Sequence, residues 1–380
     1  MSPFIFIIAL FQIIVFLGHL LLYKTLVRFL GLPGTAALKT VLAVLSVSFI
    51  SASVLTFKKS GALVHVFYTL SACWLGVFHF LFWSCILCWS AWWAHKAAGV
   101  RFDSVPWAAT LLILGLVTGI YGIVNAGDIR IKKIGVSLPS QAEDSASAQS
   151  DLWADPWKGK SAVFISDLHL GPVRNLGFAR EVAAKIKEIG PDILFIGGDF
   201  YDGTSTTHAE DLIKPFAEIN PPLGAYFITG NHEEFSARAK KKYVQAVREA
   251  GIKVLGNQLV EVDGLQIAGV DYMDTFTRSQ YENVLKAMNF NRAEPVLLLK
   301  HSPMYPDVSQ KEGVTFEICG HTHKGQIFPV NLITHYVYNG FDGGLKKLGA
   351  LTVYTSTGVG TWGPPLRAGN RPEIVLIRFL

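Results

Sequence analysis

The fold of the carboxyl-terminal two thirds is decided by residues 162–169, which read AVFISDLH, an apolar run followed at once by Asp167 and His169. Successive side chains of a strand point to opposite faces, so residues two apart share a face. Asp167 and His169 can therefore reach one metal ion together. The same spacing relates His321 and His323, which follow the apolar run VTFEIC.

Three further polar motifs lie between these two, and each also follows an apolar, strand-like run. They are Gly198-Asp199 after DILFIGG, Gly230-Asn231-His232-Glu233 after AYFIT, and His301 after VLLLK. Helix-like stretches at Phe178–Ile189 and Ser236–Ala250 favour repeated βαβ units. Sites in such sheets lie outside the carboxyl ends of the strands, so we expect all five motifs to converge.

The five motifs supply carboxylate, amide and imidazole groups, which are the ligands that a pair of divalent metals needs. Mn, Fe or Zn suits this mixture of oxygen and nitrogen ligands, and no thiolate is offered. Cys319 reads as a small buried apolar residue of a strand. A single Asp-x-His or His-x-His pair is more simply explained as polar surface or a hydrogen-bonded histidine. Five motifs together favour a metal site that hydrolyses a phosphate ester.

This set of motifs resembles the calcineurin-like metallophosphoesterase family over roughly residues 160–380. The resemblance implies an α/β domain of the α/β/β/α sandwich type with two divalent metal ions. It implies that Asp167, His169 and His323 hold the first metal, that Asn231, His301 and His321 hold the second, and that Asp199 bridges the two. His232 matches the family's non-ligand histidine, which protonates the leaving group or stabilises charge on the phosphate. A hydroxide that bridges the metals would attack phosphorus in line.

Three residues are candidates for substrate binding. Glu233 matches the acidic residue that often follows the non-ligand histidine, and we expect it to orient that ring. Lys324 replaces a second glycine of the most similar subgroup, and it either touches a substrate phosphate or points to solvent. Arg367 lies in a closing segment, residues 358–367, that resembles anchored cell-envelope phosphodiesterases. Its guanidinium suits a phosphate oxygen, and a structural ion pair is the alternative.

Residues 1–126 contain four apolar runs, near or above the ~20 residues that a membrane helix needs. The runs are Phe4–Leu22, Val41–Phe57, Ala62–Trp93 and Trp107–Val124. No turn signal interrupts the third, so we expect one tilted or extended helix there. In residues 127–159, Ile129–Leu138 alternates like a strand and Gln141–Gln149 reads as an exposed loop. We expect a multi-pass protein of the bacterial cell (inner) membrane.

The side of the membrane that the catalytic domain faces is not decided by the sequence. Five basic residues flank the four helices on each side, so the positive-inside rule gives no answer. Three of the four cysteines lie in the third apolar run, which leaves Cys319 without an intradomain partner. His19, His65 and His79 lie in the apolar runs, where we expect hydrogen bonds within the bundle, with haem ligation as the alternative.

Charge is divided unevenly along the chain. The chain has 34 basic and 29 acidic residues. Residues 1–126 contain seven of the basic residues and one of the acidic residues, so the remainder contains 27 basic and 28 acidic residues. A soluble domain this close to neutrality argues against a general nucleic-acid-binding enzyme. Lys240, Lys241 and Lys242 form the one basic run near the motifs. They form either a solvated face or a contact with anionic lipid headgroups.

We therefore expect a membrane-anchored dimetal phosphoesterase that hydrolyses a phosphodiester or diphosphate. A lipid-linked or membrane-proximal substrate would explain the anchor, and some members of the family hydrolyse an acylated UDP-sugar. One alternative is a phosphomonoesterase acting on soluble substrates and merely localised at the membrane. Another is a non-catalytic metal-binding membrane sensor or partner module. Monoester and diester hydrolysis use the same ligands, so the motifs do not distinguish them.

Overall fold

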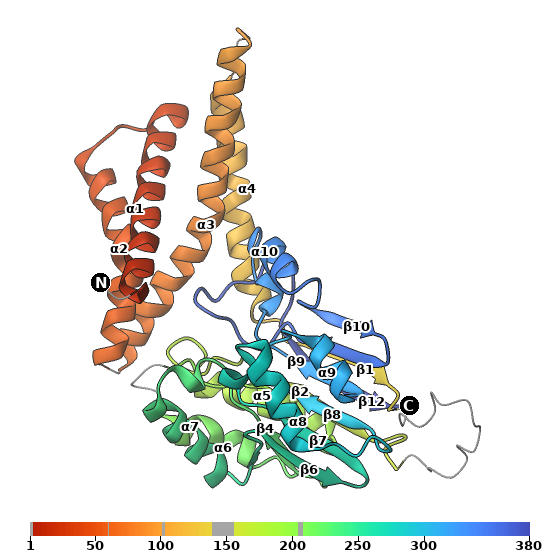
Figure 1. Cartoon of the computed structure of the whole chain (residues 1–380). Helices are drawn as coiled ribbons and strands as arrows, with labels where there is room; N and C mark the ends of the chain where they lie inside the picture. Colours follow the sequence, from red (N-terminus) through yellow and green to blue (C-terminus); the bar gives the residue numbers. More distant parts are fainter. Residues whose placement is uncertain (1–2, 60, 101–102, 139–155, 204–207) are drawn as a thin grey trace. The chain divides into compact units, whose positions relative to one another are not determined.

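The computed structural model describes residues 3–59, 61–100, 103–138, 156–203 and 208–380 (Figure 1). The expected loop Gln141–Gln149 lies outside these residues. The chain divides into a helical unit, Met1–Asn125 with Gly363–Ala368, and a catalytic unit, Ala126–Trp362 with Gly369–Leu380. A short segment near the carboxyl terminus thus belongs with the amino-terminal helices.

Four long helices make up most of the helical unit (red to light orange in Figure 1). They are α1 Pro3–Leu30, α2 Ala36–Lys58, α3 Ala62–Ala97 and α4 Ser104–Asn125. All four are long and apolar enough to cross a membrane. The third is one continuous helix, as the sequence predicted, and α1 continues past the predicted end at Leu22. Large apolar side chains remain exposed along these helices, as a lipid-facing surface requires.

Small residues on α4 allow it to approach α3 closely. A Cβ added at Gly119 would lie only 2.9 Å from the backbone of Val77, and Gly115 faces Phe80 in the same way. Such a small-xxx-small pair is typical of packed membrane helices. At the next turn, Gly122 accepts a hydrogen bond from the backbone N–H of Arg367, at 2.8 Å.

The expectation that membrane histidines hydrogen-bond within the bundle is confirmed for His19. Its Nδ1 bonds to the carbonyl oxygen of Val15 at 2.8 Å, and its Nε2 accepts from the indole of Trp74 at 2.9 Å. Trp89 makes a comparable contact with Thr25 at 3.0 Å. The bonds from Trp74 and Trp89 connect α3 to α1. They supply polar partners to polar groups inside an apolar bundle.

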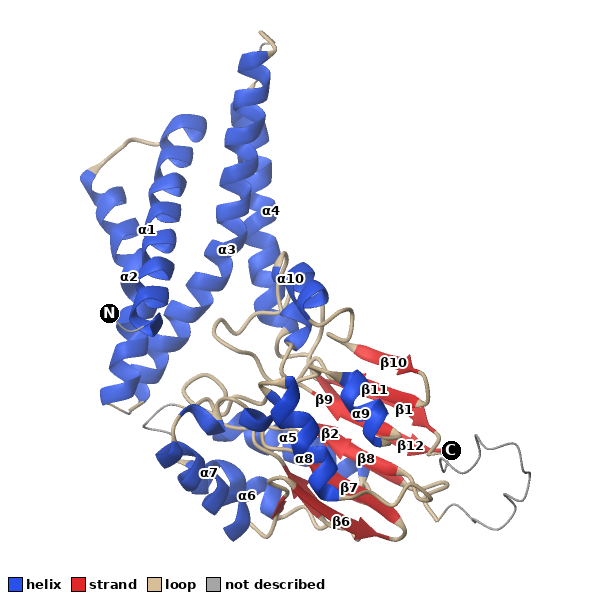
Figure 2. Cartoon of the chain, in the orientation of Figure 1, coloured by secondary structure: helices blue, strands red, loops and turns tan. Residues whose placement is uncertain are grey.

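The catalytic unit is built on two six-stranded mixed sheets (Figure 2). The first has the order β1-β12-β2-β3-β4-β5, from Arg130–Val136, Glu373–Phe379, Ser161–Ile165, Ile193–Ile196, Ala225–Phe227 and Lys253–Val254. The second has the order β10-β11-β9-β8-β7-β6, from Gly344–Leu348, Leu351–Thr355, Phe316–Cys319, Val296–Leu299, Leu265–Gly269 and Gln258–Val262. Strands β2 to β5 run parallel, as do β7, β8, β9 and β11.

Alternation along the strands sorts apolar side chains into separate layers. On β2, Ala162 and Phe164 join the core that both sheets share, whereas Val163 and Ile165 join a core with helices. Those helices are α5 Leu176–Ile189, α6 Ala209–Ala217 and α7 Ala237–Glu249. The outer face of the second sheet packs with α8 Arg278–Met288 and α9 Pro306–Glu312. The predicted α/β/β/α order of layers is confirmed.

The core between the sheets generates a stability prediction. Phe164 is fully buried there, so Phe164→Ala removes the packing contacts of the ring and leaves a cavity in the core. We expect the free energy of unfolding to fall by about 3–5 kcal/mol. Chemical denaturation of the full chain in detergent measures it. Phe276→Ala, at a position 65% exposed, is the matched control and should change little. Equal losses in the two variants would contradict the layer assignment.

Candidate metal centre

The five sequence motifs all follow the carboxyl ends of parallel strands. Asp167 and His169 follow β2, Asp199 follows β3, and Asn231 follows β4 in the first sheet. His301 follows β8, and the His321–His323 pair follows β9 in the second sheet. The loops at these strand ends bring together residues that are far apart in the sequence, as expected for parallel strands.

Their ligand atoms lie close together around Asp199. The Asp199 Oδ2 atom is 3.1 Å from His301 Nε2 and 3.9 Å from His169 Nε2. His169 Nε2 in turn lies 3.0 Å from His323 Nε2, which is 3.5 Å from Asp167 Oδ1. One carboxylate oxygen therefore lies between two groups of possible ligands.

Among the residues that the structure describes, three sets have ligand atoms within 4.8 Å of one another. The sets are Asp167, His169 and His323; His169, Asp199 and His232; and Asp199, His301 and His321. The first matches the trio expected for the first metal, and the third contains two of the three residues expected for the second. Asp199 occurs in two sets, which is the geometry that a bridging carboxylate needs.

Asn231 supplies a test of whether the residues fit a metal. Its Oδ1 atom is buried and accepts no hydrogen bond from the described residues. A buried polar atom without a partner costs about 1–3 kcal/mol, and a cation would remove that cost. Together with two carboxylates and four imidazoles, this amide oxygen forms a donor set suited to Mn, Fe or Zn.

The charges in the cluster are strongly perturbed because they are buried. Burial, opposed by His301 and reinforced by Asp199, raises the pKa of Asp167 to about 6. Burial, reinforced by the positive charge of His301, lowers the pKa of His321 to about 3, so its imidazole is neutral. Burial would lower the pKa of His301, but Asp199 and Asp167 outweigh it and raise that pKa to about 10. A metal bound there must displace this proton.

Two backbone carbonyl groups fix the orientation of the histidine rings. His301 Nδ1 donates to the carbonyl oxygen of Gly197 at 2.7 Å, which leaves Nε2 toward Asp199. His232 Nδ1 donates to the carbonyl oxygen of Asp202 at 3.0 Å. Because Nδ1 of each ring is bonded to a carbonyl oxygen, Nε2 is the atom left to coordinate a metal or carry a proton for the substrate.

The backbone of the ligand loops is unusual. Five ligand positions have left-handed φ angles, namely Asp167, His169, Asp199, His321 and His323. Such conformations cost energy in non-glycine residues and occur most often at functional sites. Neighbouring glycines allow the close approach that these loops require. A side chain at Gly230 would overlap the Asp199 carboxylate, and one at Gly320 would overlap that of Asp167.

Glu233 makes backbone contacts that its motif does not predict. Its fully buried carboxylate accepts backbone N–H groups from Asp199 at 2.9 Å, Tyr201 at 3.0 Å and Gly230 at 2.8 Å. It thus supports the backbone of two candidate ligand loops, and its charge is one of the causes that raise the pKa of the adjacent His232. This geometry favours a positioning role over substrate contact.

The other two substrate candidates are placed separately. Lys324 is exposed and belongs to the catalytic unit, directly after His323. Its φ of +47° explains why a glycine suits this position. Arg367 is fully buried and belongs to the helical unit, where Asn125 Nδ2 donates to its carbonyl oxygen at 2.9 Å.

Two supporting residues were not predicted. Asp202 orients His232 and places a carboxylate oxygen 3.9 Å from His169 Nδ1. Its place three residues after Asp199 is a weak signal in the sequence. Asn370 Nδ2 donates to the carbonyl oxygen of His323 at 2.8 Å, from a segment 47 residues away. No local sequence pattern predicts a contact between residues that are so far apart in the chain.

One lysine of the basic run on α7, Lys240, forms ion pairs with two neighbouring acidic residues. Lys240 Nζ lies 2.9 Å from Glu234 and 2.7 Å from Asp271, and Thr229 also bonds to Asp271 at 2.9 Å. These contacts anchor the loop that carries Asn231 and His232. Lys240 therefore has a structural role in this loop.

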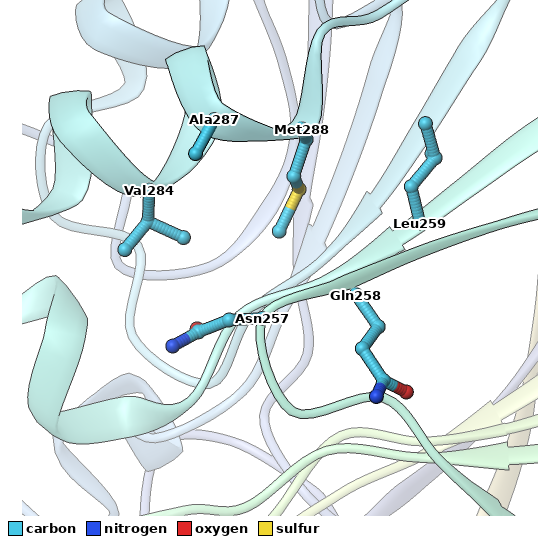
Figure 3. A pocket seen from close by; sticks show the side chains of 6 residues that line it. All are labelled: Asn257, Gln258, Leu259, Val284, Ala287 and Met288. Atoms are coloured by element: carbon cyan, nitrogen blue, oxygen red, sulfur yellow. The ribbon is translucent and has the colours of Figure 1, made fainter.

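A groove of about 540 Å³ is lined by residues of α8, β6 and the turn before β6 (Figure 3). Its lining residues are Asn257, Gln258, Leu259, Val284, Ala287 and Met288. They offer two amides and apolar side chains, and none of the candidate metal ligands is among them. The groove has no acid, base or nucleophile, so we assign the chemistry to the cluster around Asp199.

Comparison with known proteins gives matches over the catalytic unit. A model of the calcineurin-like phosphoesterase family matches residues 161–325. An uncharacterised metallophosphoesterase of Aquifex aeolicus is 35% identical over 221 residues, which cover 56% of this chain and 82% of that protein.

A zebrafish (Danio rerio) relative is described as a transmembrane protein with a metallophosphoesterase domain. It is 29% identical over 281 residues, covering 70% of this chain and 61% of that protein. The chain thus spans only about three fifths of this relative. A crystal structure of a dimetal phosphatase from Danio rerio covers 53% of this chain and 88% of its own, at 12% identity and a TM-score of 0.37.

Removal of a single ligand should reduce metal content. We expect about two metal ions per chain in the wild type and about one in His301→Ala, because His301 occurs in only one of the three sets of candidate ligands. Elemental analysis after dialysis against manganese measures the ratio. His208→Ala, at an exposed histidine outside the three sets, should keep both ions. Unchanged content in His301→Ala would contradict the assignment.

Replacement of Glu233 tests its positioning role. Glu233→Gln puts an NH₂ group opposite backbone N–H donors, so we expect a loss of about 1–3 kcal/mol in the free energy of unfolding. Metal content should also fall, because the Asp199 and Gly230 loops lose their shared acceptor. Glu261→Gln on the exposed side of β6 is the control. Full stability and full metal content in Glu233→Gln would overturn this role.

Proposed function

Since this chain belongs to the calcineurin-like phosphoesterase family, we propose that it is a membrane-anchored, dimetal phosphoesterase that hydrolyses a phosphodiester or a diphosphate. The observation that carries the proposal is the position of Asp199 between two groups of possible ligands. Asp167, His169 and His323 would hold one metal, and Asn231, His301 and His321 the other. We propose Mn, Fe or Zn as the ions.

When bound, the two metals would supply positive charge for the phosphate oxygens and a lowered pKa for water. The protein's own contribution is rigid positioning of this charge. Glu233 holds the Asp199 and Gly230 loops through their N–H groups, and Gly197 fixes the His301 ring. Preorganised charges in a buried site act more strongly than charges in water.

His232 is suited to donate a proton to the leaving oxygen. One of its ring nitrogens lies within 4.8 Å of ligand atoms of both His169 and Asp199. Its Nδ1 is bonded to Asp202, so Nε2 is the nitrogen available to a substrate. Burial would lower its pKa, but Asp199 and Asp202 outweigh burial and raise the pKa above the ordinary value. A raised pKa favours the protonated ring, which is the form that a proton donor requires.

We propose a lipid-linked or membrane-proximal substrate, of which an acylated UDP-sugar is one form. Support comes from four helices that are able to span a membrane in the same chain as the metal centre. The transmembrane description of the zebrafish relative is consistent with it. The exposed Lys324 directly follows a candidate ligand and is available to a phosphate oxygen. We further propose a multi-pass topology in a bacterial inner membrane.

Turnover of chromogenic esters tests the activity. With manganese, we expect the full chain to hydrolyse bis(p-nitrophenyl) phosphate faster than p-nitrophenyl phosphate, and chelation to abolish both rates. His232→Ala should lower kcat for the diester by roughly 10²–10⁴ with metal content unchanged, because only a proton donor is lost. His208→Ala is the matched control.

Each other outcome selects an alternative. A preference for the monoester would replace the proposal with a phosphomonoesterase localised at the membrane. Absence of turnover of both esters, in folded and metal-loaded protein, would favour a metal-binding sensor or partner module.

A further inference from the structure

Helix α10, Val330–Val337, has the reverse of the usual arrangement of side chains. A surface helix normally turns its apolar residues inward and its polar residues to water. None of the α10 residues is buried. Leu332, Ile333 and Tyr336 are 58%, 59% and 84% exposed, and Val337 is 50% exposed. The helix therefore presents aliphatic and aromatic side chains outward.

The polar residues of α10 attach it to the catalytic unit. Thr334 Oγ1 donates to Asp342 Oδ2 at 3.4 Å, and His335 Nδ1 lies 3.1 Å from Asp342 Oδ1. Asp342 itself is only 4% exposed. Asn331 and Thr334 are half-buried, whereas Leu332 and Ile333 are not. The orientation of the helix is thus held by polar contacts, and its apolar side faces away from its own domain.

Neighbouring residues extend this apolar surface. Phe328 is 53% exposed and Trp362 is 61% exposed. Gln326 exchanges two hydrogen bonds with the backbone of Trp362, at 2.9 and 3.0 Å, so the tryptophan lies beside the segment that leads into α10. We call the surface formed by Phe328, Leu332, Ile333, Tyr336, Val337 and Trp362 the α10 face.

We propose that the α10 face inserts into the interfacial region of a lipid bilayer. The catalytic unit follows directly on a candidate membrane helix, because α4 ends at Asn125 and β1 begins at Arg130. A short helix with one apolar face can lie in the plane of the interface. Tyr336 and Trp362 are residue types enriched at headgroup level.

Lysines close to α10 in the sequence are also consistent with a lipid bilayer as the partner of the α10 face. Lys324 precedes the helix, and Lys346 and Lys347 lie on β10, which follows it. All three lysines are exposed. Lysines near an inserted apolar helix are attracted to anionic headgroups. An anionic bilayer therefore matches both the apolar and the charged parts of this surface.

Both ends of α10 are coupled to the last ligand loop. At its start, Gly325 packs so closely on Asn331 that a side chain at position 325 would overlap the helix backbone. At its end, the Tyr338 ring lies 6.1 Å from the ring of His321. Insertion of α10 would therefore hold the metal centre at the bilayer surface. This consequence for the substrate rests on the proposed function, whereas insertion itself does not.

Lipid-borne quenchers test insertion in the full chain. Ile333→Cys, in a Cys73→Ser background, would be labelled with a solvent-sensitive fluorophore and placed in nanodiscs of anionic and zwitterionic phospholipid. Cys85, Cys88 and Cys319 are buried and remain. We expect blue-shifted emission and about twofold or greater quenching by acyl-chain nitroxides. Glu261→Cys, on the exposed side of β6, should remain unquenched.

Two outcomes would overturn insertion. Emission typical of water at position 333, with no more quenching than at position 261, would show that the face stays in solvent. Blue-shifted emission without lipid quenching would show that protein covers the face, either from a second copy or from this chain.

Activity on two substrates separates insertion from the proposed function. The double variant Leu332→Asp/Ile333→Asp should keep its metal and hydrolyse a soluble diester within about twofold of wild type, but hydrolyse a bilayer-embedded phosphate ester about fivefold or more slowly. The variant Leu332→Met/Ile333→Leu should match wild type on both substrates. Equal losses on both substrates in the aspartate variant would contradict the membrane role. Quenching without any wild-type hydrolysis would refute the proposed function and leave insertion supported.

Discussion

The catalytic unit depends on a concentration of buried negative charge. Asp167, Asp199 and Glu233 are at most 2% exposed, and Asp202 faces the same histidines. Carboxylates in this environment are unstable unless cations or hydrogen-bond donors offset them. Backbone N–H groups satisfy Glu233, and His301 compensates Asp199 when no metal is bound. Divalent ions would satisfy the remaining oxygen and nitrogen atoms.

The arrangement of the surrounding chain follows from that requirement. Loops from both sheets must approach within hydrogen-bonding distance, and left-handed residues with adjacent glycines make this possible. The strain in these loops is offset by the stability of the core beneath, where the strands that precede the loops, β2, β3, β4, β8 and β9, are completely buried. Stability of the sheets and geometry of the site are therefore linked through short strand-end loops.

The sequence predicted the parts of this structure that have a local signature. Continuous apolar runs located β2, β3, β4, β8 and β9, and the polar motifs that follow them located the candidate ligands. Contacts between distant segments had no such signature. Examples are the pairing of β1 with β12, the bond from Asn370 to the His323 loop, and the return of Gly363–Ala368 to the helical unit.

The role of Glu233 was also beyond local reasoning. A motif shows that an acid follows His232, but it does not show that the carboxylate turns toward three backbone N–H groups. Similarly, composition alone does not reveal α10 as an inverted helix. Its residues are ordinary for a buried helix, and only their exposure in the folded domain identifies an unsatisfied apolar surface.

The central claim is that Asp199 links two metals in one centre. Electron paramagnetic resonance of the manganese-loaded full chain tests it most directly, because two Mn²⁺ ions that share a carboxylate are magnetically coupled. We predict the spectrum of a coupled pair in the wild type, and its conversion to that of isolated ions in Asp199→Ala. A spectrum of isolated ions in fully loaded wild-type protein would contradict the account.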